Sequence, residues 1–579
     1  MKITLPRRMV AAIASLGLAL VALPVAAPAA NAAEACGLGE TCSGTLTGSL
    51  GETTFEIRMP ARFNGTVLLY SHGYRIADPV PAIVGTRLQF DRNPFYSEVS
   101  IPALAAVVGS PTAYVGNNLA QVAPSTESAA NLLSQGYALA GAGYARQGWA
   151  VAEGVEAGEL LIRHINAGAV PRTRQVLAWG DSMGGLIAQT LAQRNPRRIA
   201  GTLPLCGALE GPEQAFSGGM TVMYAWKTLV DPSLKVANYA PGQAGYAQAI
   251  GDLLKVAQTL GQVAENPAAV SSVGFPVALA NFLSGLLAGL PTKSITYDGL
   301  SVNPAVGTLG PLEARAQGFS PVTSGANSVA AMSENVFQAA ALAIMGRFNL
   351  EQIARQVGQI PADGNSNFND NVPVVYSSLL TIEQRREFED TFASVSGTLL
   401  DTMLGALDAT VGNAQARFPA NPTAVAVVRG IPAAKAAYGQ PTIYMTTAYD
   451  PIVSAGNTRK FFFDSSRTKA ARDAQRKGML KIGQYYTMPL KEDYTSFAPD
   501  AKAPSTQLSA LAAGGSGVGH CTFTPAQHAA GVRALNALVR AKTPRAVTAA
   551  KRIPYSAPGV NRDRLFLPEP LKFPLATAR

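Results

Sequence analysis

The sequence predicts an α/β protein with a mostly parallel sheet flanked by helices. Short apolar runs alternate with helical patterns as far as Leu205, as in parallel strands joined by helices. The segment 207–435 then contains helical patterns and few strand signals, and a strand pattern resumes at 440–447. We therefore expect one sheet, interrupted by a large helical insertion, in this chain of 579 residues.

The first 32 residues have the pattern of an export signal. Basic residues precede an apolar run at 9–25, and an Ala-x-Ala cleavage pattern ends at Ala32. An uncleaved membrane anchor is the alternative, and the pair Arg7 and Arg8 leaves both Sec and twin-arginine export open. The small residues after the apolar run favour cleavage. We therefore expect a secreted, extracellular protein that begins near Ala33.

The segment between the signal and residue 175 is expected to form the first half of the sheet. Alternation over 44–59 predicts an antiparallel pair at a sheet edge. The segment 75–125 is rich in loop signals. Buried strands are expected at 66–71 and 136–144, and helices at 126–135 and 151–167.

The stretch 175–188 is the centre of the functional prediction. An apolar run at 176–179 breaks at Gly180–Gly185 and continues as a helical pattern, so a G-x-S-x-G motif lies between a strand and a helix. Glycines beside Ser182 allow close approach of strand and helix, and the turn would present the hydroxyl at a helix N-terminus. The alternative is a serine without chemistry in a glycine-rich turn. The strand and helix on either side favour a nucleophile.

This arrangement resembles the α/β-hydrolase superfamily, and in particular secreted bacterial esterases and lipases with a large helical cap. The resemblance implies the α/β-hydrolase fold and the chain order Ser, then Asp or Glu, then His. It also implies an oxyanion hole. The step His72-Gly73 after the strand 66–71 would supply the amide of Tyr74, and the elbow would supply the amide of Met183. A plain strand-ending turn at His72-Gly73 is the alternative.

Asp450 is the candidate for the acid of the triad. It follows the apolar strand pattern 440–447, and the superfamily places its acid after the strand beyond the cap. A solvated Asp-Pro turn is the alternative interpretation. Four other acids lack this strand–loop context: Asp401, Asp408, Asp464 and Asp493.

His520 is the candidate for the base. It lies in the glycine-rich loop 514–523, just before the helical pattern 525–539, where the superfamily carries its histidine. A structural histidine is the alternative. The three other histidines fit less well, because one precedes Ser182 and two lie on predicted helices: His72, His164 and His528.

The segment 207–435 is interpreted as a helical cap over the carboxyl ends of the strands, where ligands bind in open α/β sheets. The apolar run 275–290 is shorter than the roughly 20 residues that span a bilayer, so we expect no stable membrane insertion. It is expected to face the pocket or the cap core. Candidate helices are 246–265, 275–290, 329–357 and 382–417.

The four cysteines suit an oxidising compartment. Their spacing suggests the pairs Cys36–Cys42 and Cys206–Cys521, although four cysteines allow three pairings. If Ser182 and His520 act together, both Cys206 and Cys521 come near the site, which makes this bond plausible; two buried free thiols are the alternative. Bridged cysteines beside the serine and histidine occur in tannases and feruloyl esterases. This chain departs from that pattern because Asp181 precedes Ser182.

The formal charge of +10 gives little case for a nucleic-acid partner. The C-terminal segment 542–579 carries eight basic and two acidic residues and six prolines, so we expect an extended tail that could touch anionic surfaces. No P-loop or zinc spacing is present in the sequence, and we expect no cofactor and no metal.

Together these features predict a serine hydrolase for small or polymeric carboxylic esters with hydrophobic parts. The alternatives are a secreted serine peptidase or aminopeptidase on the same scaffold, an acyltransferase, or a binding protein that kept the fold. The predicted organisation is a signal peptide (1–32), a first core part (33–206), a cap (207–435), a second core part (436–541) and a basic tail (542–579).

Overall fold

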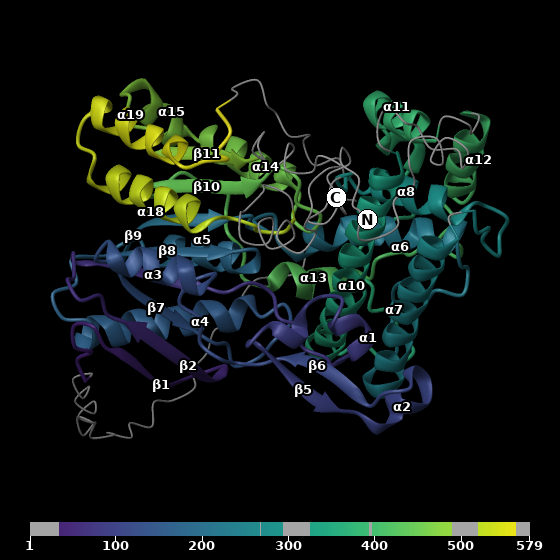
Figure 1. Ribbon diagram of the computed structural model, residues 1–579, viewed down its shortest axis with the longest axis horizontal. Helices are drawn as coiled ribbons and strands as arrows, with labels where there is room; N and C mark the ends of the chain where they lie inside the picture. The colour runs from purple at the N-terminus through teal and green to yellow at the C-terminus, as the bar shows by residue number, and fades with distance from the viewer. Residues whose placement is uncertain (1–33, 267, 293–324, 393–396, 489–518, 563–579) are drawn as a thin grey trace, which may run out of the picture.

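The computed structural model describes residues 34–266, 268–292, 325–392, 397–488 and 519–562. The export signal, most of the glycine-rich loop before Gly519 and the last residues of the tail lie outside this range. Figure 1 shows a sheet with its helices on the left and a group of long helices on the right.

An eight-stranded, mostly parallel sheet is the core of the molecule, and it confirms the predicted fold class. Strand β2 runs antiparallel to both of its neighbours, and the other pairs from β7 to β11 are parallel. The first hairpin lies at the sheet edge, as predicted. The strand order is β1 (Thr41–Gly48), β2 (Gly51–Arg58), β7 (Ala138–Ala142), β3 (Thr66–Ser71), β8 (Gln175–Asp181), β9 (Ile199–Leu205), β10 (Thr442–Thr447) and β11 (Ile482–Thr487).

Helices cover both faces of the sheet, because alternate strand residues point to opposite sides. Val67 and Leu69 of β3 pack into one apolar cluster with α4 and α5, whereas Leu68 and Tyr70 pack into another with α3 and α18. This explains why 66–71 has no polar face. The covering helices are α3 (Thr126–Ser134), α4 (Val151–His164) with the π-turn Ile165–Ala169, α5 (Met183–Arg194), α14 (Ala455–Ser466), α15 (Lys469–Arg476) and α18 (Pro525–Arg540).

The segment 75–125 contains more structure than its loop signals predicted. A second, antiparallel sheet with the order β4–β6–β5 forms here. Its residues Val80 and Ala113 are buried in the same cluster as the long helices, so this sheet packs against them. The elements are β4 (Val80–Pro81), α1 (Ala82–Gly85), η1 (Phe90–Arg92), β5 (Tyr96–Ser100), α2 (Pro102–Val108) and β6 (Thr112–Gly116).

The described part of 207–435 is helical and contributes no strand to either sheet. The apolar residues of α8 are buried in the core of this helical region, in line with the prediction for 275–290. The predicted helix 382–417 is wrong beyond Asp408, where turns follow. The helices are α6 (Pro212–Leu229), α7 (Gly242–Glu265), α8 (Val277–Leu287), α10 (Gly325–Gly358), η4 (Tyr376–Leu379), α11 (Ile382–Thr391), α12 (Gly397–Asp408) and α13 (Pro422–Gly430).

Helix α10 is the longest described helix, and its part Val329–Gly358 is long and apolar enough to cross a membrane by length and composition alone. However, 72% of the most apolar window of this helix is buried inside the protein. Leu350 and Ala354 pack toward the sheet, while Ile344 and Phe348 pack among the other helices. The apolar surface of α10 is therefore covered as in a core helix.

The expectation of an extended tail is wrong for its first part. Pro544 begins a helix, α19 (Pro544–Arg552), and η5 (Ile553–Ser556) follows. Thr543 caps α19 by accepting a hydrogen bond from the amide of Ala546, and proline suits the first turn because it lacks an amide that would need a partner. Val547 is buried against the sheet layer, so this segment belongs to the core.

Candidate active site

The turn between β8 and α5 has the geometry of a nucleophile elbow. Ser182 adopts φ 55° and ψ −125°, a region that residues with side chains rarely enter. A Cβ atom at Gly184 would lie 2.0 Å from the carbonyl oxygen of Ser71, and one at Gly180 would lie 2.5 Å from the same oxygen. The two glycines therefore allow the close approach, while the unusual backbone conformation belongs to Ser182 itself.

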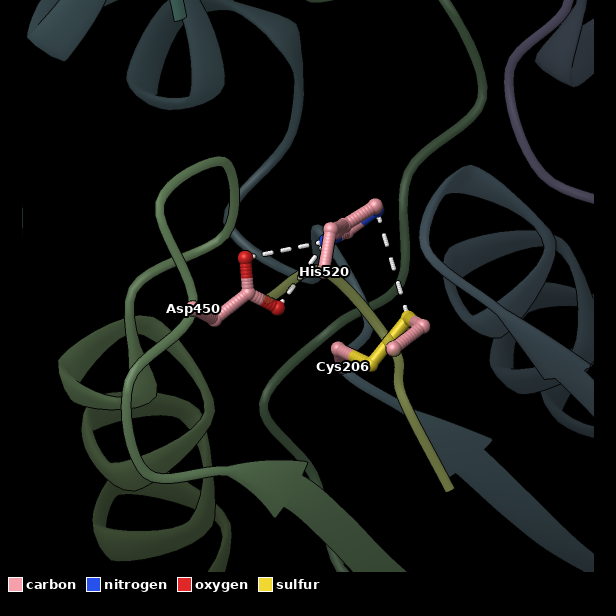
Figure 2. Close-up of side chains that lie close together, drawn as sticks. Cys206, Asp450 and His520 are labelled. Carbon is pink, nitrogen blue, oxygen red and sulfur yellow. Dashed lines mark hydrogen bonds and ion pairs between the residues drawn. A yellow bond between two sulfur atoms is a disulfide. The ribbon is translucent and has the colours of Figure 1, made fainter. Parts of the chain in front are cut away.

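Asp450 and His520 are hydrogen-bonded, as Figure 2 shows. His520 Nδ1 lies 3.0 Å from Oδ1 and 2.9 Å from Oδ2 of Asp450. The carboxylate is oriented by the amides of Ile452 and Val453, each 2.9 Å from Oδ1. The Asp450 side chain is fully buried and that of His520 is 20% exposed. One imidazole nitrogen is thus held by an acid, and the other is left for a reacting group.

Backbone contacts bring His520 to the same edge of the sheet as Ser182. The Ser182 amide donates to the Leu205 carbonyl at 2.9 Å, and the sulfur of Cys521 lies 3.6 Å from that same oxygen. Ser182 and His520 share no hydrogen bond in the described residues. His520 Nε2 instead lies 3.9 Å from the sulfur of Cys521. Contacts of this kind often tighten only when substrate is bound.

Both expected disulfides are present in the structure. Cys206 and Cys521 are bonded with their Cα atoms 5.7 Å apart, and Cys36 and Cys42 are bonded with theirs 5.9 Å apart. The first bond fastens the residue after His520 to the end of β9 (Figure 2). It therefore holds the histidine loop against the strand that follows the serine helix.

The two candidate oxyanion amides lie on either side of Ser182. Met183 begins α5, so its amide is one of the N-terminal amides that have no partner within the helix. The other turn is also close, because a Cβ atom at Gly73 would lie 3.3 Å from Cβ of Ser182. Tyr74 follows that glycine. The structure places both residues beside the serine, and their role in binding an oxyanion remains a prediction.

A cleft opens beside Asp450, between the sheet edge and the long helices. The empty space in it is about 640 Å³, a figure that includes the part open to solvent. Most of its lining is small or apolar. The lining residues are Ala208, Gln214, Ala215, Phe216, Gly218, Gly219, Ala288, Gly289, Leu290, Ala339, Leu342, Ala343, Asp450, Pro451, Ile452, Val453, Ser454 and Asn457.

His520 differs from the other histidines in its electrostatics. Burial lowers the pKa of His520, but the charge of Asp450, the hydrogen bond that His520 donates to Asp450 and the charge of Asp181 together raise that pKa above its ordinary value. Burial instead lowers the pKa of His72, and it lowers the pKa of His528 to about 3. These two histidines and His164 contact, respectively, the ring of Tyr144, the hydroxyl of Ser128 and the ring of Phe55. The structure thus supports the choice of His520 by elimination.

Two groups of potential metal ligands occur in the described residues, and each contains a disulfide. Cys206 and Cys521 are bonded to each other, so they offer no thiolates to a metal. Asp450 and His520 then remain, and they are hydrogen-bonded to each other. Neither group has the free ligands that a zinc site requires.

Two features of this site escaped sequence reasoning. The cleft requires residues from α6, α10 and the turn after β10, and no local pattern joins these segments. The half-buried Asp181 next to Ser182 also has partners distant in sequence, including Tyr70. Its position beside the motif could have drawn attention, because acids are rarely buried without a partner.

Comparisons with known proteins found only distant similarity. No protein-family model matches the chain, and no curated protein matches it. Among solved structures, the esterase LipA from Xanthomonas oryzae, which degrades rice cell walls, is 11% identical over 81% of this chain and 87% of its own length, with a TM-score of 0.27. A bacterial heroin esterase is 15% identical over 31% of this chain and 48% of its own, with a TM-score of 0.20. An arylesterase is 16% identical over 31% and 48%, with a TM-score of 0.18.

The chain thus spans about half the length of the arylesterase and the heroin esterase. Such similarity is too distant to carry residue roles, so the site must be judged from its own geometry. The sheet supplies the fold assignment: β8 leads into the strained serine, and β10 leads into the buried acid that holds the histidine. The chain has the α/β-hydrolase fold.

Proposed function

We propose that this protein is a secreted serine hydrolase that cleaves carboxylic esters with hydrophobic parts through an acyl-enzyme. One observation carries the proposal. The buried Asp450 orients His520. The disulfide of the next residue, Cys521, holds His520 at the sheet edge where Ser182 lies on a strained turn. A structural serine would have no need of this conformation, which costs on the order of 1–3 kcal/mol.

In the proposed reaction, Ser182 Oγ attacks the acyl carbon while its proton passes to His520 Nε2. The carbonyl electron pair moves onto oxygen, which the amides of Met183 and Tyr74 would stabilise. The carbon–oxygen bond then breaks, and the imidazolium returns the proton to the leaving alcohol. Water repeats the sequence to release the acid. Asp450 keeps the proton on Nδ1 of the neutral imidazole and stabilises the imidazolium.

The cleft supports esters with an apolar part. Its lining offers the side chains of Phe216, Leu290 and Leu342 and little charge apart from Asp450. Apolar groups gain about 25 cal/mol for each Å² they remove from water, so a longer acyl chain should bind more tightly until the cleft is full. Substitution of Ala343 by leucine should then disfavour long chains more than acetate.

Labelling with a fluorophosphonate, followed by peptide mass spectrometry, tests the nucleophile. We expect the adduct on Ser182, and none on the Ser182→Ala variant or on heat-unfolded protein. Activity is then measured on chromogenic esters of rising acyl length, beside aminoacyl anilides. Esters should be cleaved and anilides should not. Labelling at another serine would refute the mechanism, and preference for anilides would favour a peptidase. Capture of the acyl group by an added alcohol would favour an acyltransferase.

Secretion belongs to the same proposal. Two disulfides are compatible with an oxidising compartment. Expression with the native leader should release protein that begins near residue 33, and retention of the full-length chain in the cell would contradict this. The basic tail is proposed to touch anionic surfaces. Replacement of the exposed Lys542, Arg545 and Arg552 by glutamine should lower retention on an anionic matrix while leaving ester hydrolysis unchanged.

A further inference from the structure

Asp181 is a half-buried acid that the proposed mechanism leaves without a role. It is the last residue of β8 and directly precedes Ser182. The hydroxyl of Tyr70, on the neighbouring strand β3, donates to Asp181 Oδ1 at 2.5 Å. A Cβ atom at Gly73 would lie 3.9 Å from the same oxygen. This carboxylate therefore lies beneath the serine, beside the turn that leads to Tyr74.

Arg75 supplies a buried positive charge near this acid. It is 4% exposed and donates to the carbonyls of Asn117 and Leu119 and to Oε1 of Gln121. Within the described residues it forms no ion pair. Burial raises the pKa of Asp181 above its ordinary value, although the hydrogen bond from Tyr70 and the positive charges of His520 and Arg75 oppose this rise. A buried cation without a direct partner favours a negative charge on the nearest acid.

Sheet register brings Asp181 toward His520. Asp181 pairs with Leu205 in neighbouring strands, and the Leu205 carbonyl lies 3.6 Å from the sulfur of Cys521, the residue after His520. The charged groups that act on His520 are Asp450, at the end of β10, and Asp181, at the end of β8. Both are carboxylates, and they approach from different strands.

We infer that Asp181 is a second positioning carboxylate for His520, held ionised between Tyr70 and Arg75, which stabilises the imidazolium formed when Ser182 gives up its proton. The inference rests on the proposed function. Asp181 exchanges no proton in the step. The proton moves from Ser182 Oγ to His520 Nε2, while the new oxygen–carbon bond forms and the carbonyl pair moves to oxygen. Asp181 contributes only its charge, because direct contact with His520 belongs to Asp450.

The pH dependence tests this inference. His520 must be neutral to act as a base, so activity falls at low pH with the pKa of His520. Because the negative charge of Asp181 raises that pKa, Asp181→Asn should shift the acid limb of kcat/KM to lower pH and reduce the plateau kcat by roughly tenfold. Asp401→Asn, the same charge change at an exposed site in α12, should shift nothing.

Proton NMR titration of His520 supplies a readout that does not require activity. The chain has four histidines, so His520→Gln identifies the signal. The pKa should fall in Asp181→Asn and be restored in Asp181→Glu, which keeps the charge. Equal titration curves in wild type and Asp181→Asn would overturn the inference. So would equal losses in the Asn and Glu variants, which would indicate a packing role. Absence of esterase activity in the wild type would instead refute the proposed function, while the titration would still measure the effect of Asp181.

Discussion

Two buried charge clusters of the described residues differ in how fully their polar atoms are paired. In α10, Arg347 and Glu351 lie 3.6 Å apart and are almost fully buried. Arg347 donates to the amide oxygens of Asn367 and Asn369 at 2.8 and 2.6 Å. Glu351 accepts from two main-chain amides, at 2.9 and 2.7 Å. At the sheet edge, by contrast, His520 has one paired nitrogen and one with only a sulfur neighbour.

Burial of charge therefore does not identify a functional site by itself. The polar atoms of the α10 cluster have partners in the loop segments 238–239 and 367–369, so the cluster ties α10 to these loops. The sheet-edge cluster leaves a nitrogen of His520 without an acid partner, near the strained turn at Ser182, and its Asp450 lines a cleft. Groups left incompletely paired in a cleft are typical of sites that act on a ligand.

The largest expected effect is on activity, and it should occur only in the cluster that contains Asp450 and His520. Asp450→Asn should lower kcat by about 10⁴-fold, because the amide favours the wrong tautomer of His520. The fold should be retained, as judged by circular dichroism and thermal melting. Glu351→Gln should keep kcat per folded molecule near the wild-type value. A loss of less than about tenfold for Asp450→Asn would remove it from the catalytic group.

Removing the two disulfides one at a time compares the bond beside His520, Cys206–Cys521, with the bond far from it, Cys36–Cys42. Loss of Cys206–Cys521 opens a loop of 315 residues, and the chain-entropy description allows up to about 5 kcal/mol of lost stability. Loss of Cys36–Cys42, separated by 6 residues, should cost about 2 kcal/mol. Alanine double variants, measured by urea unfolding and kcat, should show lower activity only for the first. Equal kcat in both would mean that the bridge does not position His520.

The α10 pair should affect stability more than activity. Arg347→Met leaves Glu351 buried without its cation, and the expected loss is about 3–5 kcal/mol in the free energy of unfolding. A double variant with Glu351→Leu should recover part of this loss, because both charges are then gone. Urea denaturation measures the stability, and fluorophosphonate titration counts active sites for kcat. A tenfold fall in kcat per active site would show that this cluster reaches the chemistry.

Backbone strain gives the smallest and most specific test. Ser182→Gly should be more stable than Ser182→Ala by about 1 kcal/mol, because glycine accepts the positive φ without strain. The reverse order is expected at Ser217 inside α6, where glycine costs about 1 kcal/mol relative to alanine. Thermal melting of the four variants, two at Ser182 and two at Ser217, measures both differences in stability. Equal stability of the two Ser182 variants would mean that the turn relaxes in solution.

The sequence predicted the central elements well where a strand, a turn signal and a helix follow each other directly. The elbow at Ser182, the strand before Asp450 and the capped helix after His520 all have such local signals. Strand β11 was missed because Ile482–Thr487 mixes glycine, glutamine and tyrosines, and its pairing with β10 decides its structure. The small sheet at 80–116 was missed for the same reason.

The electrostatic surroundings of the site could not be predicted from local patterns. Asp181 accepts a hydrogen bond from Tyr70, 111 residues earlier in the chain. Arg75 donates one to the carbonyl of Asn117, which lies 42 residues later. The six prolines of 542–579 predict an extended chain, and this prediction is wrong for α19. Pro544 instead stands at the start of a helix, where proline is well tolerated.

The bond between Cys206 and Cys521 also closes the intervening chain into a covalent ring that contains every described helix from α6 to α15. A protease that cuts once inside this ring cannot separate the two products. The nicked protein would run as a single band without reductant and split into two fragments only when the bond is reduced. A single nick in this long segment would then leave the segments that carry Ser182 and His520 attached to each other.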